Sequence, residues 1–193
     1  MPKEWMIDCE TLALDSHAAV WQIALVNCAD HTEAKQWETQ PSEILHLVNN
    51  GKMLTDQSTL SWAYKTYGTA SAFARWHHAY LHDEHLETAT SITKIHDEID
   101  TKIKNGDIVW AKGADSDFPI LENMFKVSQY NHKAPWYYRD KSCMRTLVNE
   151  CKRAGMDKRT LDSMQTGTKH EAIHDCWQQI KMLHNLRTYL GLR

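Results

Sequence analysis

Glu4-Trp-Met-Ile-Asp-Cys-Glu-Thr11, close to the N-terminus, is an apolar run of strand length that ends in two acids. Side chains alternate between the two faces of a β-strand, so Asp8 and Glu10 point the same way from the expected strand Trp5 to Cys9. At a separation of about 4 Å and an effective dielectric near 20, the two charges repel by about 4 kcal/mol. The pair therefore requires a shared proton, full solvation or a cation. Two solvated acids on an exposed strand end meet this requirement too, so the pair alone does not define a site.

The rest of the chain predicts a sheet around this strand. Ala19 to Cys28 is rich in β-forming residues and predicts a neighbouring strand, and a third strand is expected near Glu33 to Thr39. Further strands are expected at Asp107 to Ala111 and Trp136 to Tyr138. Helical patterns begin near Ser58 and recur at 87–104, 117–127, 143–154 and 170–190. The order of these elements predicts an α/β fold, a mixed sheet of about five strands flanked by helices.

Length and composition limit the class of protein. The 193 residues suit one domain spanning 1–193, and 24% charged and 42% hydrophobic residues are typical of a globular chain. No apolar run approaches the roughly 18 residues that span a bilayer, and the N-terminus lacks a signal-peptide pattern, so no membrane partner is expected. The formal net charge of -3 argues against a broadly basic nucleic-acid protein.

The cysteines point to a reducing compartment. They are five in number, widely spaced and without a CxxC pair, so neither a disulfide framework nor a zinc ribbon is indicated. We therefore expect reduced thiols and a cytoplasmic location.

A third acid lies where a strand is expected to meet a helix. The segment from Ile108 to Leu121 places Asp117 at this junction, and the carboxyl ends of strands in open α/β sheets form ligand crevices. Asp115 competes for the same role. An acid that stabilises a helix N-terminus, worth about 0.3 to 1 kcal/mol, is the alternative explanation for either residue.

A histidine and an acid open the last helix. His170 and Asp175 stand five residues apart, and the small Ala172, one turn before Cys176, allows this helix to pack closely on the sheet. A surface histidine and a solvated helix acid remain the alternative explanation of the two residues.

In their order along the chain, these motifs resemble those of the DEDDh 3′–5′ exonucleases, which have the ribonuclease H-like fold. The matching motifs are Asp8-x-Glu10-Thr11, Gly113-x-x-x-Asp117-Phe118 and His170-x-Ala172-x-x-Asp175. The chain is most similar to the phage exodeoxyribonuclease A branch, related to the Rv-type exoribonuclease-like domains, and the resemblance runs from about Trp5 to the C-terminus. It selects Asp117 over Asp115, and His170 over His174.

The resemblance implies a metal-dependent reaction. Asp8, Glu10, Asp117 and Asp175 would hold two Mg²⁺ ions, which Mn²⁺ can replace, because oxygen ligands with open positions suit these ions. Two such ions neutralise charge on the scissile phosphate and help to generate the nucleophile. His170 would be the general base, since an imidazole with a pKa near 6.5 is suited to take a proton from water at neutral pH.

The implied substrate is a single strand with a free 3′ end, which loses nucleoside 5′-monophosphates one at a time. Thr11 and Leu12 would contact the terminal nucleotide, and Trp62 and Phe118 could offer stacking faces worth about 1 to 3 kcal/mol per base. Core packing explains the two aromatic residues equally well. DNA is favoured over RNA by the phage-branch similarity, and an exoribonuclease of the ribonuclease T or oligoribonuclease kind is the alternative. The sequence leaves the oligomeric state open, a homodimer included.

Two other features of the sequence are weaker indications of a functional site. A zinc site on His77, His78, His82 and His85 competes with a solvated histidine-rich face. Basic residues within 141–145 and 152–159 either line a nucleic-acid backbone or form ordinary wet surface. A non-catalytic binding module of the same fold is disfavoured, because all four acids and the histidine are present.

Overall fold

A mixed five-stranded sheet forms the centre of the molecule, in a computed structural model that describes residues 2–69, 71–164 and 170–192. Its strands lie in the order β3-β2-β1-β4-β5. The antiparallel part is β1 with β2 and β2 with β3, and the parallel part is β1 with β4 and β4 with β5. The bounds are β1 (Glu4–Thr11), β2 (Val20–Asn27), β3 (Ala34–Glu38), β4 (Ile108–Ala111) and β5 (Lys141–Cys143). The expected mixed α/β sheet is confirmed.

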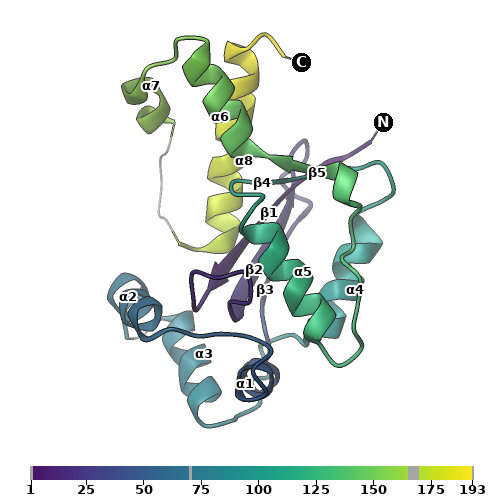
Figure 1. The fold of residues 1–193 in the computed structure, drawn as a ribbon, viewed down its shortest axis with the longest axis vertical. Helices are drawn as coiled ribbons and strands as arrows, with labels where there is room; N and C mark the ends of the chain where they lie inside the picture. The colour runs from purple at the N-terminus through teal and green to yellow at the C-terminus, as the bar shows by residue number, and fades with distance from the viewer. Residues whose placement is uncertain (1, 70, 165–169, 193) are drawn as a thin grey trace.

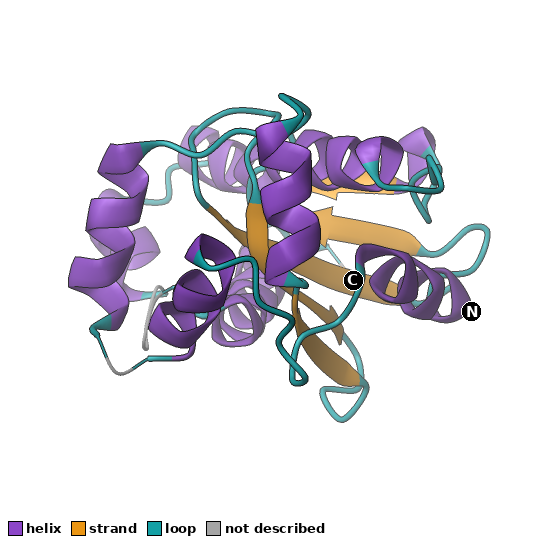
Figure 2. Cartoon of the chain, turned by 90° about the horizontal axis from the view of Figure 1, so that it is seen from below, coloured by secondary structure: helices purple, strands orange, loops and turns teal. Residues whose placement is uncertain are grey.

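Helices cover both faces of this sheet (Figures 1 and 2). Those described are α1 (Pro41–Asn49), α2 (Gln57–Tyr67), α3 (Ala72–Leu81), α4 (Ile92–Lys102), α5 (Asp117–Val127), α6 (Met144–Arg153), α7 (Lys158–Ser163) and α8 (Ala172–Tyr189). One buried cluster packs the five helices from α1 through α5 against one face of the sheet. A second cluster packs α6, α7 and α8 against the opposite face. In the described part of the chain, no helix is both long and apolar enough to cross a membrane.

β1 is apolar on both sides until its carboxyl end. Ile7 packs in the first cluster and Met6 in the second, so alternate side chains of β1 serve opposite layers. Asp8 lies two residues after Met6, so its side chain is on the same face of β1 and points toward α8. The strand thus delivers its acids to the edge of the sheet beside that helix.

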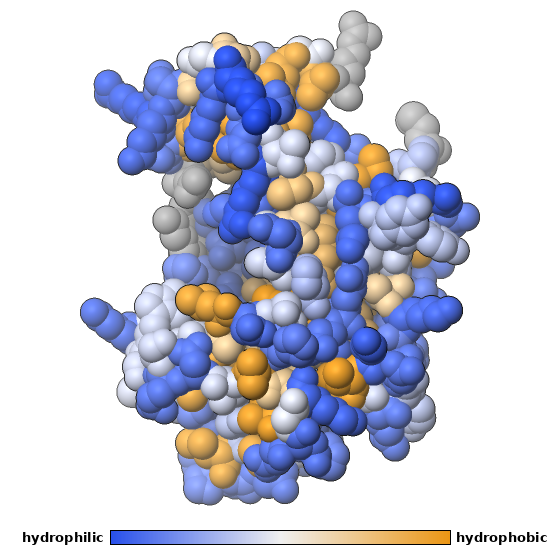
Figure 3. Space-filling view, viewed as in Figure 1, coloured by the Kyte–Doolittle hydropathy of each residue, from blue (hydrophilic) through white to orange (hydrophobic). Residues whose placement is uncertain are grey.

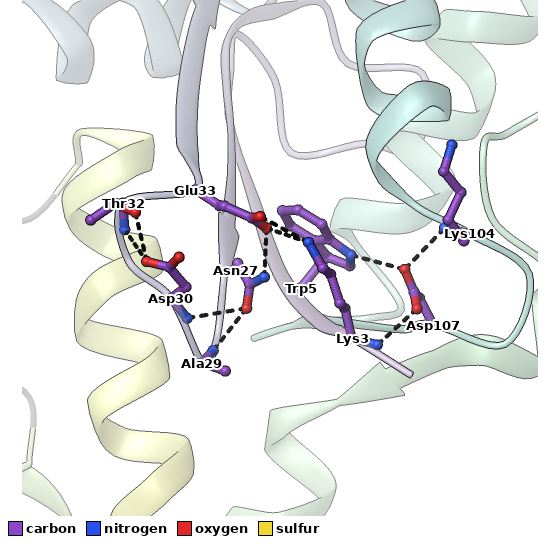
Figure 4. Close-up of polar contacts among 9 residues, drawn as sticks. All are labelled: Lys3, Trp5, Asn27, Ala29, Asp30, Thr32, Glu33, Lys104 and Asp107. Carbon is purple, nitrogen blue, oxygen red and sulfur yellow. Dashed lines mark hydrogen bonds and ion pairs between the residues drawn. The ribbon is translucent and has the colours of Figure 1, made fainter. Parts of the chain in front are cut away.

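The amino end of β1 is held by a buried carboxylate (Figure 4). Asp107 accepts hydrogen bonds from the backbone N–H groups of Lys3 and Lys104 and, at 3.2 Å, from Trp5 Nε1. The same picture shows Glu33 joining Lys3 to the turn between β2 and β3. This network anchors β1 at the end opposite its acids.

The expected strand at Trp136 to Tyr138 is wrong. The fifth strand is β5, which begins three residues after Tyr138, and the chain reaches it through a 3₁₀ turn at Tyr138–Asp140. Trp136 packs against Phe118 and donates its indole N–H to Glu122, whereas the following tyrosines are exposed. The aromatic residues are therefore used for packing and surface, and the ladder with β4 begins only at Lys141.

Candidate active site

Two elements on opposite sides hold the acids at the end of β1. Gln179 of α8 donates through Nε2 to Asp8 Oδ1 at 2.7 Å, and Asp8 is only 9% exposed. Tyr67, the last residue of α2, donates its hydroxyl to Glu10 at 3.0 Å. These bonds leave each carboxylate a second oxygen, as a cation site requires.

Asp117 is the acid that reaches this pair. It is the first residue of α5, is 9% exposed, and accepts the N–H of Gly113 at 3.2 Å. Cys9, which lies between the two acids of β1, contacts Asp117 through its thiol at 3.8 Å. Asp115 is exposed and pairs instead with Arg145 at 3.2 Å.

The start of α8 completes the group. One ligand atom each from Glu10, His170 and Asp175 lies within 4.8 Å of the others. The backbone N–H of His170 donates to Asp175 at 3.0 Å, and its imidazole meets the Trp62 ring edge-on with centroids 4.7 Å apart. Residues separated by some 160 positions in the sequence therefore share one place in the fold.

The electrostatics of the cluster favour a bound cation. Burial, followed by the charges of Asp117 and Glu10, raises the pKa of Asp8 well above its usual range. Burial also raises the pKa of Glu10 to about 7 and that of Asp117 to about 6. Each shift means that the metal-free site resists full ionisation. An all-oxygen set of carboxylates beside one imidazole fits Mg²⁺ or Mn²⁺ better than a closed zinc site.

Cavities adjoin the cluster on two sides. One of about 180 Å³ is lined by Lys112, His170, Asp175 and Gln179 among others. A second, of about 360 Å³, lies beside Glu10 and is lined by Cys9, Glu10, Thr11, Leu14, Ser58, Thr59 and Trp62. We call the second one the α2 pocket. In the space-filling view, the surface is recessed between the α2–α3 end and the α6–α7 end of the molecule (Figure 3).

The expected nucleotide contacts are only partly at the surface. Thr11 and Trp62 line the α2 pocket, and Trp62 is 41% exposed. Leu12 and Phe118 are fully buried in the core, so the expectation that they contact a base is wrong. Leu14, which the sequence reasoning missed, is 94% exposed in the same pocket. Leu12-Ala-Leu14 is uniformly apolar, so no pattern in the sequence distinguishes the exposed leucine from the buried one.

The histidine-rich segment does not gather metal ligands. His77 is buried and lies 2.6 Å from the Tyr64 hydroxyl through Nδ1, as a core histidine does. His78 lies on the surface near Glu84. Among the described residues, the sets of three ligand atoms close enough for one ion are the one at Glu10 and a second at His96, Asp97 and His132. The geometry of the described residues therefore does not support a zinc site at 77–85.

The site, with its acids at the carboxyl end of the central strand of a mixed sheet, fits the class of the 3′–5′ exonucleases. The chain belongs to the family described as the Rv2179c-like 3′-5′ exoribonuclease domain, whose model matches residues 3–187. It is thus a 3′–5′ exonuclease domain, a hydrolase of phosphodiesters. A comparison with curated proteins found no match.

Solved structures with the same fold include those of exonuclease I. The apo form is 12% identical with a TM-score of 0.64, covering 97% of this chain and 42% of that one. E. coli exonuclease I with a dT13 oligonucleotide is 12% identical with a TM-score of 0.68, covering 99% and 42%. The zinc-bound E. coli complex with single-stranded DNA is 12% identical with a TM-score of 0.64, covering 98% and 41%. The chain therefore spans about two fifths of these proteins, and the likeness is one of fold.

Proposed function

We propose that this chain degrades single-stranded DNA from its 3′ end and releases nucleoside 5′-monophosphates. The reaction uses two divalent cations, of which Mg²⁺ is the expected one. The observation that carries the proposal is the convergence of Glu10, His170 and Asp175 within 4.8 Å, beside the buried Asp8 and Asp117. Four acids and one base gathered at one place in the fold are the groups that phosphodiester hydrolysis at neutral pH needs.

The side chains divide the work. Asp8, Glu10, Asp117 and Asp175 would hold the cations, which supply charge neutralisation at the phosphate and a more acidic water. His170 accepts a proton from the attacking water, whose oxygen bonds to phosphorus. The P–O3′ bond breaks, the leaving O3′ takes a proton from solvent to give the shortened strand its 3′-hydroxyl, and the terminal nucleotide leaves as a 5′-monophosphate. His170 then returns its proton to solvent.

The α2 pocket suits the terminal nucleotide. It adjoins Glu10, and its exposed Leu14 and Trp62 offer apolar surface to one base. Thr11 adds a hydroxyl at the rim, where it bonds to the carbonyl of Ala13. We therefore assign Leu14, in place of Leu12, the contact with the terminal base.

RNA is the second candidate substrate. The description of the family as an exoribonuclease domain favours it, whereas the solved relatives include complexes with single-stranded DNA. The same cluster of acids serves either polymer, and contact with the 2′-hydroxyl distinguishes them.

Matched 5′-labelled strands test the proposal. The purified chain is mixed with DNA and RNA of one sequence in Mg²⁺, Mn²⁺ or EDTA. We expect a ladder that shortens from the 3′ end with either ion, faster for DNA, and no products in EDTA. Faster RNA cleavage would select the second candidate, and no cleavage of either strand would refute the enzyme proposal.

A further inference from the structure

A basic groove continues from the active-site cavity between α6, α7 and α8. Its volume is about 330 Å³, and it shares Lys112 and Met182 with the cavity that contains His170 and Asp175. The two cavities are therefore neighbours with a common wall. In the ribbon view, α6 and α7 lie at the opposite end of the molecule from α2 and α3 (Figure 1).

The lining of this groove, which we call the α6–α7 groove, combines cations with an apolar floor. The cations are Lys112, Arg145, Lys152 and Lys158. The apolar residues are Met144, Val148, Leu161 and Met182, and Asp162 is the acid of the lining. An apolar floor accepts bases and a basic rim accepts phosphates, as in grooves that bind single strands.

The lysines of the groove are available to a ligand. Lys112, Lys152 and Lys158 form no ion pair with any described residue, although the chain carries more acids than bases. Arg145 differs, because it pairs with Asp115 and its charge acts on Asp117. Gly113 leaves room for this arginine, since a Cβ there would lie 3.0 Å from the guanidinium. Arg145 thus lies between the groove and the catalytic acids.

The placement of the cations gives the strand a direction. A 3′-terminal nucleotide has no phosphate beyond the scissile one, so a row of cations is useful only on the 5′ side of the cut. The α2 pocket offers apolar surface beside Glu10, and the α6–α7 groove offers lysines on the other side of the cluster.

We propose that the α6–α7 groove binds the phosphates and bases 5′ to the scissile bond, so that the substrate runs from α7 across the acids to α2. Lys152 and Lys158 hold the backbone there. This inference rests on the proposed function for its direction, and it adds the site that makes longer strands better substrates.

The test compares Lys152→Ala/Lys158→Ala with the wild type and with Lys94→Ala/Lys126→Ala. The control pair removes two exposed lysines from α4 and α5, away from the groove. Binding of a labelled 12-nucleotide strand is measured by fluorescence anisotropy in Ca²⁺ at several salt concentrations. Each lost phosphate contact reduces the slope of log K against log salt by about 0.7 for a single strand. We expect a reduction of about 1.4 in the groove variant and none in the control.

Hydrolysis provides the second readout. The wild type should cleave strands of two, four, eight and twelve nucleotides with rising kcat/KM, and the groove variant should lose this dependence. Both should hydrolyse the p-nitrophenyl ester of thymidine 5′-monophosphate equally, because nitrophenol replaces the rest of the strand and no further phosphate lies on the 5′ side of the scissile bond.

The outcomes separate the two proposals. An unchanged salt slope and length dependence in the groove variant would overturn the groove assignment while leaving the exonuclease intact. An equal loss on the nitrophenyl ester would also overturn it, because the lysines would then act in folding or chemistry. A wild type that cleaves nothing would refute the proposed function, and the anisotropy slopes would still test the groove.

Discussion

His170 has a backbone φ of 71°, in the left-handed region that residues other than glycine rarely adopt. Such a conformation costs on the order of 1 to 3 kcal/mol and persists only where neighbours enforce it. Here the neighbours are Asp175, which accepts the backbone N–H, and Trp62, which meets the imidazole edge-on. The chain therefore accepts local strain in order to present this ring to the acids.

Replacing His170 by Asn removes the imidazole while keeping a residue that tolerates the backbone conformation. Asn tolerates positive φ, so His170→Asn should fold with a melting temperature close to that of the wild type. We expect kcat to fall by about 100- to 10,000-fold with strand affinity unchanged, because a general base contributes that much. Single-turnover kinetics and anisotropy measure the two effects. His174→Asn is the control, and wild-type turnover in His170→Asn would remove the histidine from the chemistry.

The two acids near α5 should behave differently. Asp117→Asn should abolish cleavage, because Asp117 is buried beside Cys9 and Asp8. Asp115→Asn should retain activity, since Asp115 is an exposed partner of Arg145. Initial rates on one labelled strand measure both, and the reverse order would contradict the assignment.

At the level of elements, the sheet caps the helix that carries Asp175. Glu171, at the start of α8, makes no side-chain cap bond. Gln22 of β2 accepts the N–H of Ala172 at 2.9 Å, and Gln36 of β3 accepts that of Ile173 at 3.0 Å. Two otherwise unpaired N–H groups of the first helical turn are thus satisfied by strands 137 and 150 residues earlier.

Removing one of these caps should affect stability and activity together. Gln22 is 1% exposed, so Gln22→Ala leaves the N–H of Ala172 without its partner inside the protein. We expect a loss of about 1 to 2 kcal/mol in the free energy of unfolding. We also expect a lower kcat, because α8 positions Asp175. Urea unfolding and initial rates measure these effects, with Gln129→Ala, an exposed glutamine after α5, as the control. Full activity in a destabilised Gln22→Ala would show that the cap does not align the site.

At the level of the whole molecule, the buried acids link stability to pH. In the metal-free protein, the pKa of Glu10 is raised from 4.5 to about 7 and that of Asp117 from 3.8 to about 6. A carboxyl with a raised pKa favours folding while it is protonated, and this contribution is lost as pH rises through the folded-state pKa. The unfolding free energy should therefore fall between about pH 4 and pH 7 because of these groups.

Thermal melts in EDTA and in Mg²⁺ measure this linkage. We expect the metal-free protein to melt at a lower temperature at pH 8 than at pH 5.5. Mg²⁺ should raise the melting temperature more at pH 8, since protons and the cation compete for the same oxygens. Glu10→Gln should show a flatter pH dependence in EDTA. A metal-free melting temperature that increases from pH 5.5 to pH 8 would contradict the linkage.

Local patterns predicted the bounds of a fully buried strand and of a helix with one buried face. Ala19 to Cys28 predicted β2 to within one residue at each end, and the 117–127 pattern matched α5. The same reasoning failed at Trp136 to Tyr138, because β-forming aromatic residues serve equally well in packing and on the surface. It also failed at Leu12 and Phe118, whose exposure depends on how the turn and α5 sit against the core.

Residue types and spacing were enough to identify the family and to select acids and a histidine that the fold then brings together, because phosphate hydrolysis needs these kinds of side chain. The folded chain alone revealed the supports: Gln179 on Asp8, Tyr67 on Glu10 and Gln22 on α8. The tertiary structure also shows that Leu14 is exposed and that Lys112 lines two neighbouring cavities. These contacts join residues far apart in the chain, and such pairings follow from the packing of helices on the sheet, which no local pattern encodes.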